Sequence, residues 1–154
     1  MEKKKVLFIG MGNSARSQMA EAFMRRYAGS SIEAFSAGLE PKAIDPMTIK
    51  AMKEIGVDMG SHYSKSISIY KDYTDFSYVI TVCGTSEKFC PSFFPGKATG
   101  LHWELGDLDD VQGTQEERIR KFREIRDQIQ DNVLAWLHER GIAIEHGGDG
   151  AARP

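Results

Sequence analysis

The stretch Val6-Leu-Phe-Ile-Gly-Met-Gly-Asn-Ser-Ala-Arg-Ser17 decides the fold, because an apolar run passes through two glycines directly into a helical pattern. Residues 6–9 suit a buried parallel strand. Over residues 17–28, apolar side chains recur three and four positions apart, which predicts a helix. A glycine-bearing turn between strand and helix directs backbone N–H groups toward its centre, and the helix dipole adds partial positive charge there. Residues 10–17 are therefore predicted to form an anion-binding loop.

The side chains of this loop favour a tetrahedral oxyanion as the ligand. Arg16 can meet two oxygens at once with its planar guanidinium, while Ser14 and Ser17 offer hydroxyl donors. Gly12 permits a positive φ or a close approach of the backbone to a ligand, and Asn13 tolerates a left-handed conformation. The predicted oxyanion-binding residues are Met11, Gly12, Asn13, Ser14, Ala15, Arg16 and Ser17.

Two other interpretations of the loop are open. It could be a tight strand–helix turn with an exposed arginine. It also matches the dinucleotide fingerprint as Gly10-x-Gly12-x-x-Ala15, with Glu33 near the position of a ribose-binding acid. Against the dinucleotide interpretation, the chain is short, Glu33 falls inside a predicted strand, and that motif does not require the Arg-Ser pair.

The rest of the chain alternates strands and helices. Further strands are predicted at residues 32–36, 76–82 and, more weakly, 97–103. One helix begins after an Asp45 N-cap and ends at Gly56, and another runs from a Thr114–Glu117 capping box to Gly141. This pattern predicts a three-layer α/β domain over residues 1–141, with about four mostly parallel strands and helices on both faces. Residues 142–154 are predicted to form a flexible tail, and the ligand should lie beyond the carboxyl ends of the strands.

Composition narrows the functional classes. The 154 residues are 41% hydrophobic, and 20 basic and 22 acidic side chains give a net charge of -2. No overall positive field exists to attract nucleic acid or an anionic membrane, and no apolar run is long enough to span a bilayer. Two cysteines, Cys83 and Cys90, cannot form a disulfide scaffold for a chain of this size. We therefore expect a cytoplasmic protein in which these cysteines, if they matter, take part in chemistry.

Residues 6–23 resemble the active-site segment of low-molecular-weight tyrosine phosphatases and thioredoxin-coupled arsenate reductases, whose loop reads Cys-x5-Arg-Ser. The resemblance covers roughly residues 4–140. It continues through Ser36-Ala-Gly38, residues 46–58, Cys83-x6-Cys90-Pro91, His102-Trp103, Asp107 and Phe122-Arg-x-x-Arg-Asp127. The cysteine pair matches the redox pair of the reductases, and residues 108–110 lack the aromatic pair expected after the acidic residue of the phosphatases. The reductase branch is therefore favoured over the phosphatase branch.

The resemblance also implies a mechanism. A thiolate at position 10 would form an adduct with arsenate, and Cys83 would attack this adduct and release arsenite. The resulting disulfide would pass to Cys83–Cys90, where thioredoxin would reduce it. Asp107 matches the general acid. This chain has Gly10 at the thiol position, and neither Met11 nor Ala15 can replace a nucleophile.

Our leading hypothesis is thus an arsenate reductase lineage that binds arsenate or phosphate without turnover, its nucleophile lost by an engineered substitution or by divergence. A low-molecular-weight tyrosine phosphatase and a natural non-catalytic oxyanion-binding module are the alternatives.

Some relatives hold a potassium ion beside the loop. Residues matching their ion site are Asn13, Glu21 and Ser36, with an acidic group where this chain has Lys65. We expect the lysine ammonium to replace the ion, and so predict no metal and no cofactor. His62 and His102 are expected to be structural.

Overall fold

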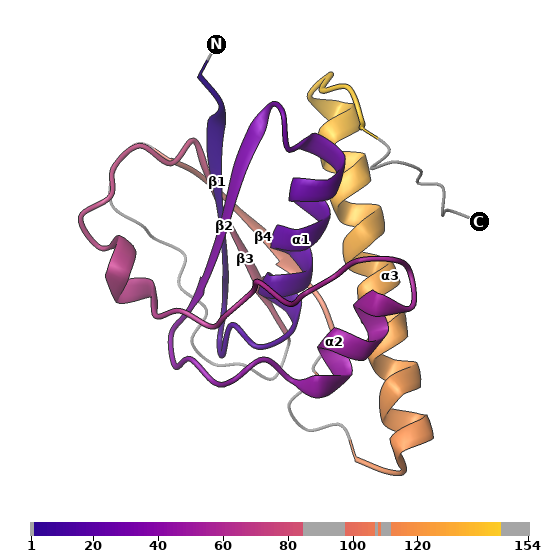
Figure 1. Cartoon of the computed structure of the whole chain (residues 1–154). Coiled ribbons are helices and arrows are strands. Elements are labelled where there is room, and N and C mark those ends of the chain that lie inside the picture. The colour runs from indigo at the N-terminus through magenta and orange to yellow at the C-terminus, as the bar shows by residue number, and fades with distance from the viewer. Residues whose placement is uncertain (1, 85–97, 107, 109–111, 146–154) are drawn as a thin grey trace.

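The computed structural model describes residues 2–84, 98–106, 108 and 112–145. Its sheet has four parallel strands in the order β2-β1-β3-β4 (Figure 1). The strands are β1 (Lys4–Gly10), β2 (Ile32–Gly38), β3 (Tyr78–Cys83) and β4 (Thr99–Glu104). Among the described residues, the α-helices are α1 (Arg16–Ala28), α2 (Pro46–Lys53) and α3 (Gln115–Glu139), and a 3-10 turn, η1, spans Ile67–Tyr70. The predicted α/β class and four-stranded parallel sheet are confirmed.

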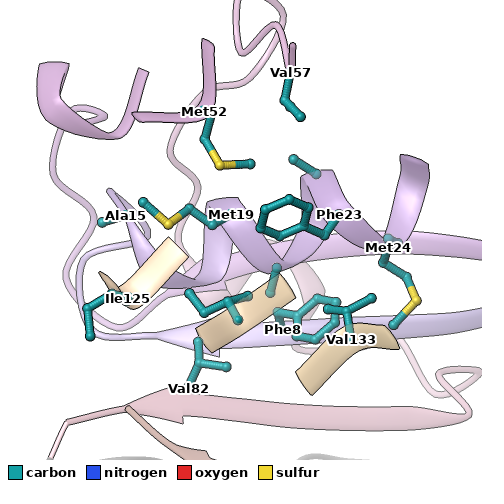
Figure 2. Packing of buried hydrophobic residues seen from close by; sticks show 14 of the residues in the cluster. Phe8, Ala15, Met19, Phe23, Met24, Met52, Val57, Val82, Ile125 and Val133 are labelled. Atoms are coloured by element: carbon teal, nitrogen blue, oxygen red, sulfur yellow. The ribbon is translucent and has the colours of Figure 1, made fainter. Parts of the chain in front are cut away.

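Alternation along β1 divides the core into two halves. Val6 and Phe8 face α1, whereas Leu7 and Ile9 face the other side of the sheet, and all four are fully buried or nearly so. Figure 2 shows Phe8 on the same side of the sheet as the α1 side chains Met19 and Phe23, within one apolar cluster that also takes in α2 and α3. Burial of a side chain as large as Phe8 stabilises a fold by about 2–3 kcal/mol.

The second face of the sheet has a different cover. Among the described residues, all three α-helices lie on the Phe8 side, and η1 with its flanking loops lies on the Leu7 side (Figure 1). There the rings of Phe35, Tyr70, Tyr73 and Phe76 meet mostly edge to face, with centroids 5.0–6.3 Å apart. Helices were predicted on both faces of the sheet. On this face the described residues form a layer of aromatic side chains around the short 3-10 helix η1.

Capping residues define the starts of α2 and α3 as the sequence predicted. The Asp45 side chain accepts from the N–H of Met47 at the start of α2. At the start of α3, Thr114 and Glu117 form both bonds of the capping box, at 3.1 and 2.8 Å. The α2 helix ends at Lys53, three residues before Gly56, whose φ of 83° lies in the turn that follows.

The end of the described chain returns to the core. Ile142 packs against the apolar cluster, and the N–H of Glu145 donates to the carbonyl of Tyr27 at 2.8 Å. The rest of the predicted tail, residues 146–154, lies outside the described residues. Within the described chain, no helix is both long and apolar enough to cross a membrane.

Candidate oxyanion site

The loop of residues 10–17 joins the carboxyl end of β1 to the start of α1, where the sequence predicted it. Its carbonyl oxygens bond outward to the segment that follows β2. The N–H groups of residues 39, 40, 42 and 45 donate to the carbonyls of Gly10, Met11, Gly12 and Ser14 at 2.8–3.2 Å. The fifth carbonyl, that of Asn13, accepts from the side chains of Gln18 and Ser64. These hydrogen bonds to the loop carbonyls fix the outer edge of the loop.

In contrast to the loop carbonyls, several backbone N–H groups of the loop have no hydrogen-bond acceptor among the described residues. Among the hydrogen bonds of the described residues, none has the N–H of Gly12, Asn13, Ser14 or Ala15 as donor. Ala15 is the N-cap of α1 and supplies no side-chain cap, whereas α2 and α3 both have one. The unpaired N–H groups and the positive end of the helix dipole are the features that bind anions in proteins. A small hollow here is lined by residues 10–17 and Leu108.

Arg16 lies at this hollow and is 7% exposed. One guanidinium nitrogen, Nη1, donates to the carbonyl of Gly106 at 3.2 Å, just after β4. The sequence-predicted general acid, Asp107, lies outside the described residues. Both of its neighbours, Gly106 and Leu108, border the loop.

Asn13 has the left-handed backbone conformation in this loop, with a φ of 51°, and asparagine is a residue type that tolerates it. The positive φ considered for Gly12 is absent, and a Cβ there would meet nothing closer than 3.5 Å. The glycine that this backbone requires is Gly38, which the sequence analysis did not single out as structural. A Cβ at position 38 would lie 2.8 Å from the Asn13 nitrogen and 2.9 Å from the Met11 oxygen.

The Asn13 side chain, 1% exposed for the whole residue, is the centre of a buried hydrogen-bond network. Its Nδ2 donates to the hydroxyl of Ser17 at 2.8 Å and to that of Ser36 at 3.0 Å. Its Oδ1 accepts from Nε2 of Gln18 and from the backbone N–H of Lys65, both at 2.9 Å. The network ties the loop to α1, β2 and the segment before η1.

A buried carboxylate continues this network behind the loop. Glu21 accepts from the Ser36 hydroxyl at 2.5 Å and forms an ion pair with Arg25 at 2.6 Å. The Lys65 ammonium lies 3.9 Å from the same carboxylate, and burial lowers its pKa. The sequence analysis predicted this group of residues, with the Lys65 ammonium near Glu21 and Ser36. Among the described residues, no cluster of three or more His, Cys, Asp or Glu side chains could hold a metal ion.

His62 and Gln18 were not predicted to support the loop. His62 Nδ1 lies 2.9 Å from Oε1 of Gln18, whose Nε2 holds Asn13, and burial lowers the pKa of the imidazole. Their contact spans 44 positions in sequence, so no local pattern could reveal it. His102 hydrogen-bonds Thr81 at 2.7 Å in the neighbouring strands.

Gly10 has an ordinary backbone conformation, since its φ is not positive. A Cβ at this position would lie 3.1 Å from the Ser17 hydroxyl oxygen and 3.8 Å from Cγ2 of Val82, so a side chain fits with a small shift of Ser17. Cys83 is buried at the end of β3, the strand that pairs with β1. Cys90 lies outside the described residues. The fold therefore does not require glycine at position 10.

These features define a candidate oxyanion-binding α/β domain. The first strand of a parallel sheet leads into a loop with unpaired N–H groups, and an uncapped helix and an arginine lie beside that loop. The chain belongs to the low molecular weight phosphotyrosine protein phosphatase family, whose model matches residues 5–145.

Named relatives of this chain include arsenate reductases. The arsenate reductase of Halalkalibacterium halodurans is 38% identical over 136 residues, which cover 88% of this chain and 96% of the relative. A solved arsenate reductase in the phosphate binding state is 29% identical, with a TM-score of 0.71 over 88% of this chain and 98% of that one. A thioredoxin-dependent arsenate reductase of Corynebacterium glutamicum is 30% identical, with a TM-score of 0.57 over 87% and 63% of the two chains.

Proposed function

We propose that this chain binds a tetrahedral oxyanion, arsenate or phosphate, in the loop of residues 10–17 and does not turn it over. It derives from the arsenate reductase branch of its family and has lost the attacking thiol at position 10. The observation that carries the proposal is the combination of unpaired loop N–H groups with a glycine that the fold does not need. It would act in the cytoplasm, where thioredoxin keeps thiols reduced.

Binding rests on donors of two kinds. The loop N–H groups and the α1 dipole favour negative charge at the hollow. The Arg16 guanidinium, held near the loop by Gly106, can donate two parallel hydrogen bonds to two oxygens of one anion. Because a charge-assisted hydrogen bond contributes about 1.5–3 kcal/mol, loss of Arg16 should weaken binding by roughly tenfold or more.

Turnover fails for lack of a nucleophile. Attack on arsenic or phosphorus needs a group below the anion and in line with the leaving oxygen, and Gly10 has no side chain to supply one. The Ser17 hydroxyl is close to that point, but it accepts from Asn13, and an uncharged hydroxyl is a weak nucleophile. Within the loop, Met11 and Ala15 are apolar and Ser14 lacks an evident base.

In the ancestral reaction, Cys83 and Cys90 would supply the two electrons and two protons that convert arsenate to arsenite and water. They would close a disulfide in doing so, and a thioredoxin dithiol would reopen it. Asp107 would protonate the leaving oxygen. The thioredoxin-dependent relative supports this assignment of the reductant.

Calorimetry with phosphate and with arsenate tests the binding. We expect millimolar or tighter affinity, and loss of most of it in Arg16→Ala. A matched Arg16→Lys variant keeps the charge without the planar fork and should retain only part of the affinity. Absence of binding in the millimolar range, or equal affinity in Arg16→Ala, would contradict the proposal.

Restoring the thiol tests the lineage. Gly10→Cys should gain thioredoxin-dependent arsenate reduction, whereas Gly10→Ala, which adds the same Cβ without sulfur, should not. Hydrolysis of an aryl phosphate by Gly10→Cys without arsenate reduction would instead favour the phosphatase alternative. If Gly10→Cys binds phosphate and has neither activity, the lost-nucleophile proposal fails and only the binding module remains.

A further inference from the structure

A second cavity lies at the opposite end of the sheet from the loop. It has a volume of about 490 Å³ and lies between the starts of β1, β2 and β3 and the end of α3. Its walls include Lys4, Ile32, Tyr78, Trp136 and Arg140. Figure 1 shows the first residues of β1 and the last turn of α3 at the same end of the molecule. Since β1 has seven residues, roughly 20 Å separates this cavity from residue 10.

Aromatic rings and a guanidinium form one side of this cavity. The rings of Tyr78 and Trp136 meet edge to face, with centroids 5.0 Å apart. The guanidinium carbon of Arg140 lies 4.4 Å from the Trp136 ring centroid and 5.3 Å from that of Tyr78. Cation–π contact uses the flat face of a guanidinium and leaves the N–H groups at its edge for an acceptor.

Trp136 and Arg140 differ in how far their donors are buried and paired. The indole N–H of Trp136 is buried and has no hydrogen-bond partner among the described residues. Arg140 forms an ion pair with Glu139 at 3.7 Å, but the Glu139 side chain is 69% exposed, so the pair is weak. Buried donors in native proteins are nearly always paired, so the unpaired indole N–H is unusual, and the part-exposed Arg140 is the donor of this pair that a ligand can reach.

The charges around the cavity favour an anion. Lys3, Lys4 and Arg140 line it together with one carboxylate, that of Glu2. The C-terminal end of α3 carries partial negative charge, which is reduced because the carbonyls of Leu137 and His138 accept from the N–H groups of residues 140–142. The volume lies in the range of small-molecule sites.

We propose that this cavity binds a small, flat organic anion, an aromatic carboxylate or a close analogue. The apolar ring would pack against Tyr78, Trp136 and Ile32, and the carboxylate would accept from the edge of Arg140 and attract Lys4. The site is independent of the oxyanion loop and of the function proposed for it.

Nuclear magnetic resonance of the ¹⁵N-labelled chain with 2-naphthoate as the probe tests this site. The sequence has two tryptophans, so Trp103→Phe assigns the indole N–H signal of Trp136. We expect this signal to move with a saturable dependence on 2-naphthoate. Arg140→Gln, which keeps part of the stem, should weaken binding by about tenfold, because a charge-assisted hydrogen bond is lost. Lys4→Gln should weaken it less.

Three controls separate this proposal from simpler causes. Neutral 2-naphthamide should bind more weakly than 2-naphthoate, whereas saturating phosphate and the Arg16→Ala substitution should leave the affinity for 2-naphthoate unchanged. Thermal melts should show that Arg140→Gln folds normally. The proposal is wrong if no signal moves in the millimolar range, if naphthamide binds equally well, or if phosphate displaces the probe.

Discussion

Replacing Asn13 by alanine should both destabilise the fold and weaken the binding of phosphate that we propose for the loop. The substitution removes four buried side-chain hydrogen bonds, to Ser17, Ser36, Gln18 and Lys65. At about 1 kcal/mol net for each bond, the loss is about 4 kcal/mol, and water entering the space would recover part of it. Alanine at the φ of 51° adds about 1 kcal/mol of strain. We therefore expect the free energy of unfolding to fall by about 3–5 kcal/mol.

Urea denaturation measures this change, and calorimetry with phosphate measures the loop. Asn13→Gly loses the same bonds without the left-handed strain, so it should be up to about 1 kcal/mol more stable than Asn13→Ala. Asn13→Asp keeps the shape and the Oδ1 acceptor but replaces the Nδ2 donor with a second acceptor oxygen, so its stability should lie between those of the parent and the alanine variant. Phosphate affinity should fall by at least about tenfold in Asn13→Ala, because the loop N–H groups lose their fixed positions.

The reasoning would be refuted by an Asn13→Ala variant within about 1 kcal/mol of the parent. It would also be refuted if Asn13→Gly were less stable than Asn13→Ala, since the left-handed backbone would then have no energetic consequence. An unchanged phosphate affinity in a folded Asn13→Ala would show that the loop keeps its shape without this network.

Two further predictions concern a glycine and an ion pair. Gly38→Ala forces a Cβ against the backbone of Asn13 and should destabilise the chain more than Gly12→Ala, whose Cβ has room; equal denaturation midpoints would contradict this. Glu54 has a pKa held below its ordinary value, first by hydrogen bonds from Arg123. The Glu54 carboxylate therefore adds its full contribution to the free energy of unfolding above the ordinary pKa of glutamate. This contribution is lost as pH falls through the lower pKa that Glu54 has in the folded state. The stability difference between the parent and Glu54→Gln, measured by urea denaturation from about pH 6 to pH 3, should shrink as pH falls, and a constant difference would contradict the assignment.

Local chemistry made much of the fold predictable. The loop, the Asp45 cap and the capping box at Thr114 each depend on residues within a few positions of one another, and the structure has all three. The strands β1 and β3 were found to within a few residues because buried parallel strands are continuous apolar runs, whereas the edge strand β4 is largely exposed and was the weaker prediction. Strand order does not follow from such runs, since pairing depends on contacts across the chain.

The parts that escaped prediction are long-range. Gly38 is required because β2 brings it against residue 13, twenty-five positions away, and nothing beside Gly38 in the sequence signals that contact. The same holds for His62, which reaches the loop through Gln18. The sequence offered both Gly12 and Asn13 for the left-handed position. The residue types alone do not determine which of them has a positive φ, because that depends on the path of the backbone through the loop. The aromatic cover of the second face was missed because its rings come from β2 and from irregular segments around η1.

The arrangement of the loop explains how a chain of this family could lose its nucleophile and keep its binding site. The carbonyls are held by the segment after β2, the Asn13 side chain by its buried network, and Arg16 by the carbonyl of Gly106. None of these contacts uses a side chain at position 10. Removing a thiol there would therefore leave the shape of the loop intact, and returning it as Gly10→Cys would place sulfur in a site that is already formed. The proposed loss of the thiol is compatible with a preserved loop because the contacts that hold the loop do not involve a side chain at position 10.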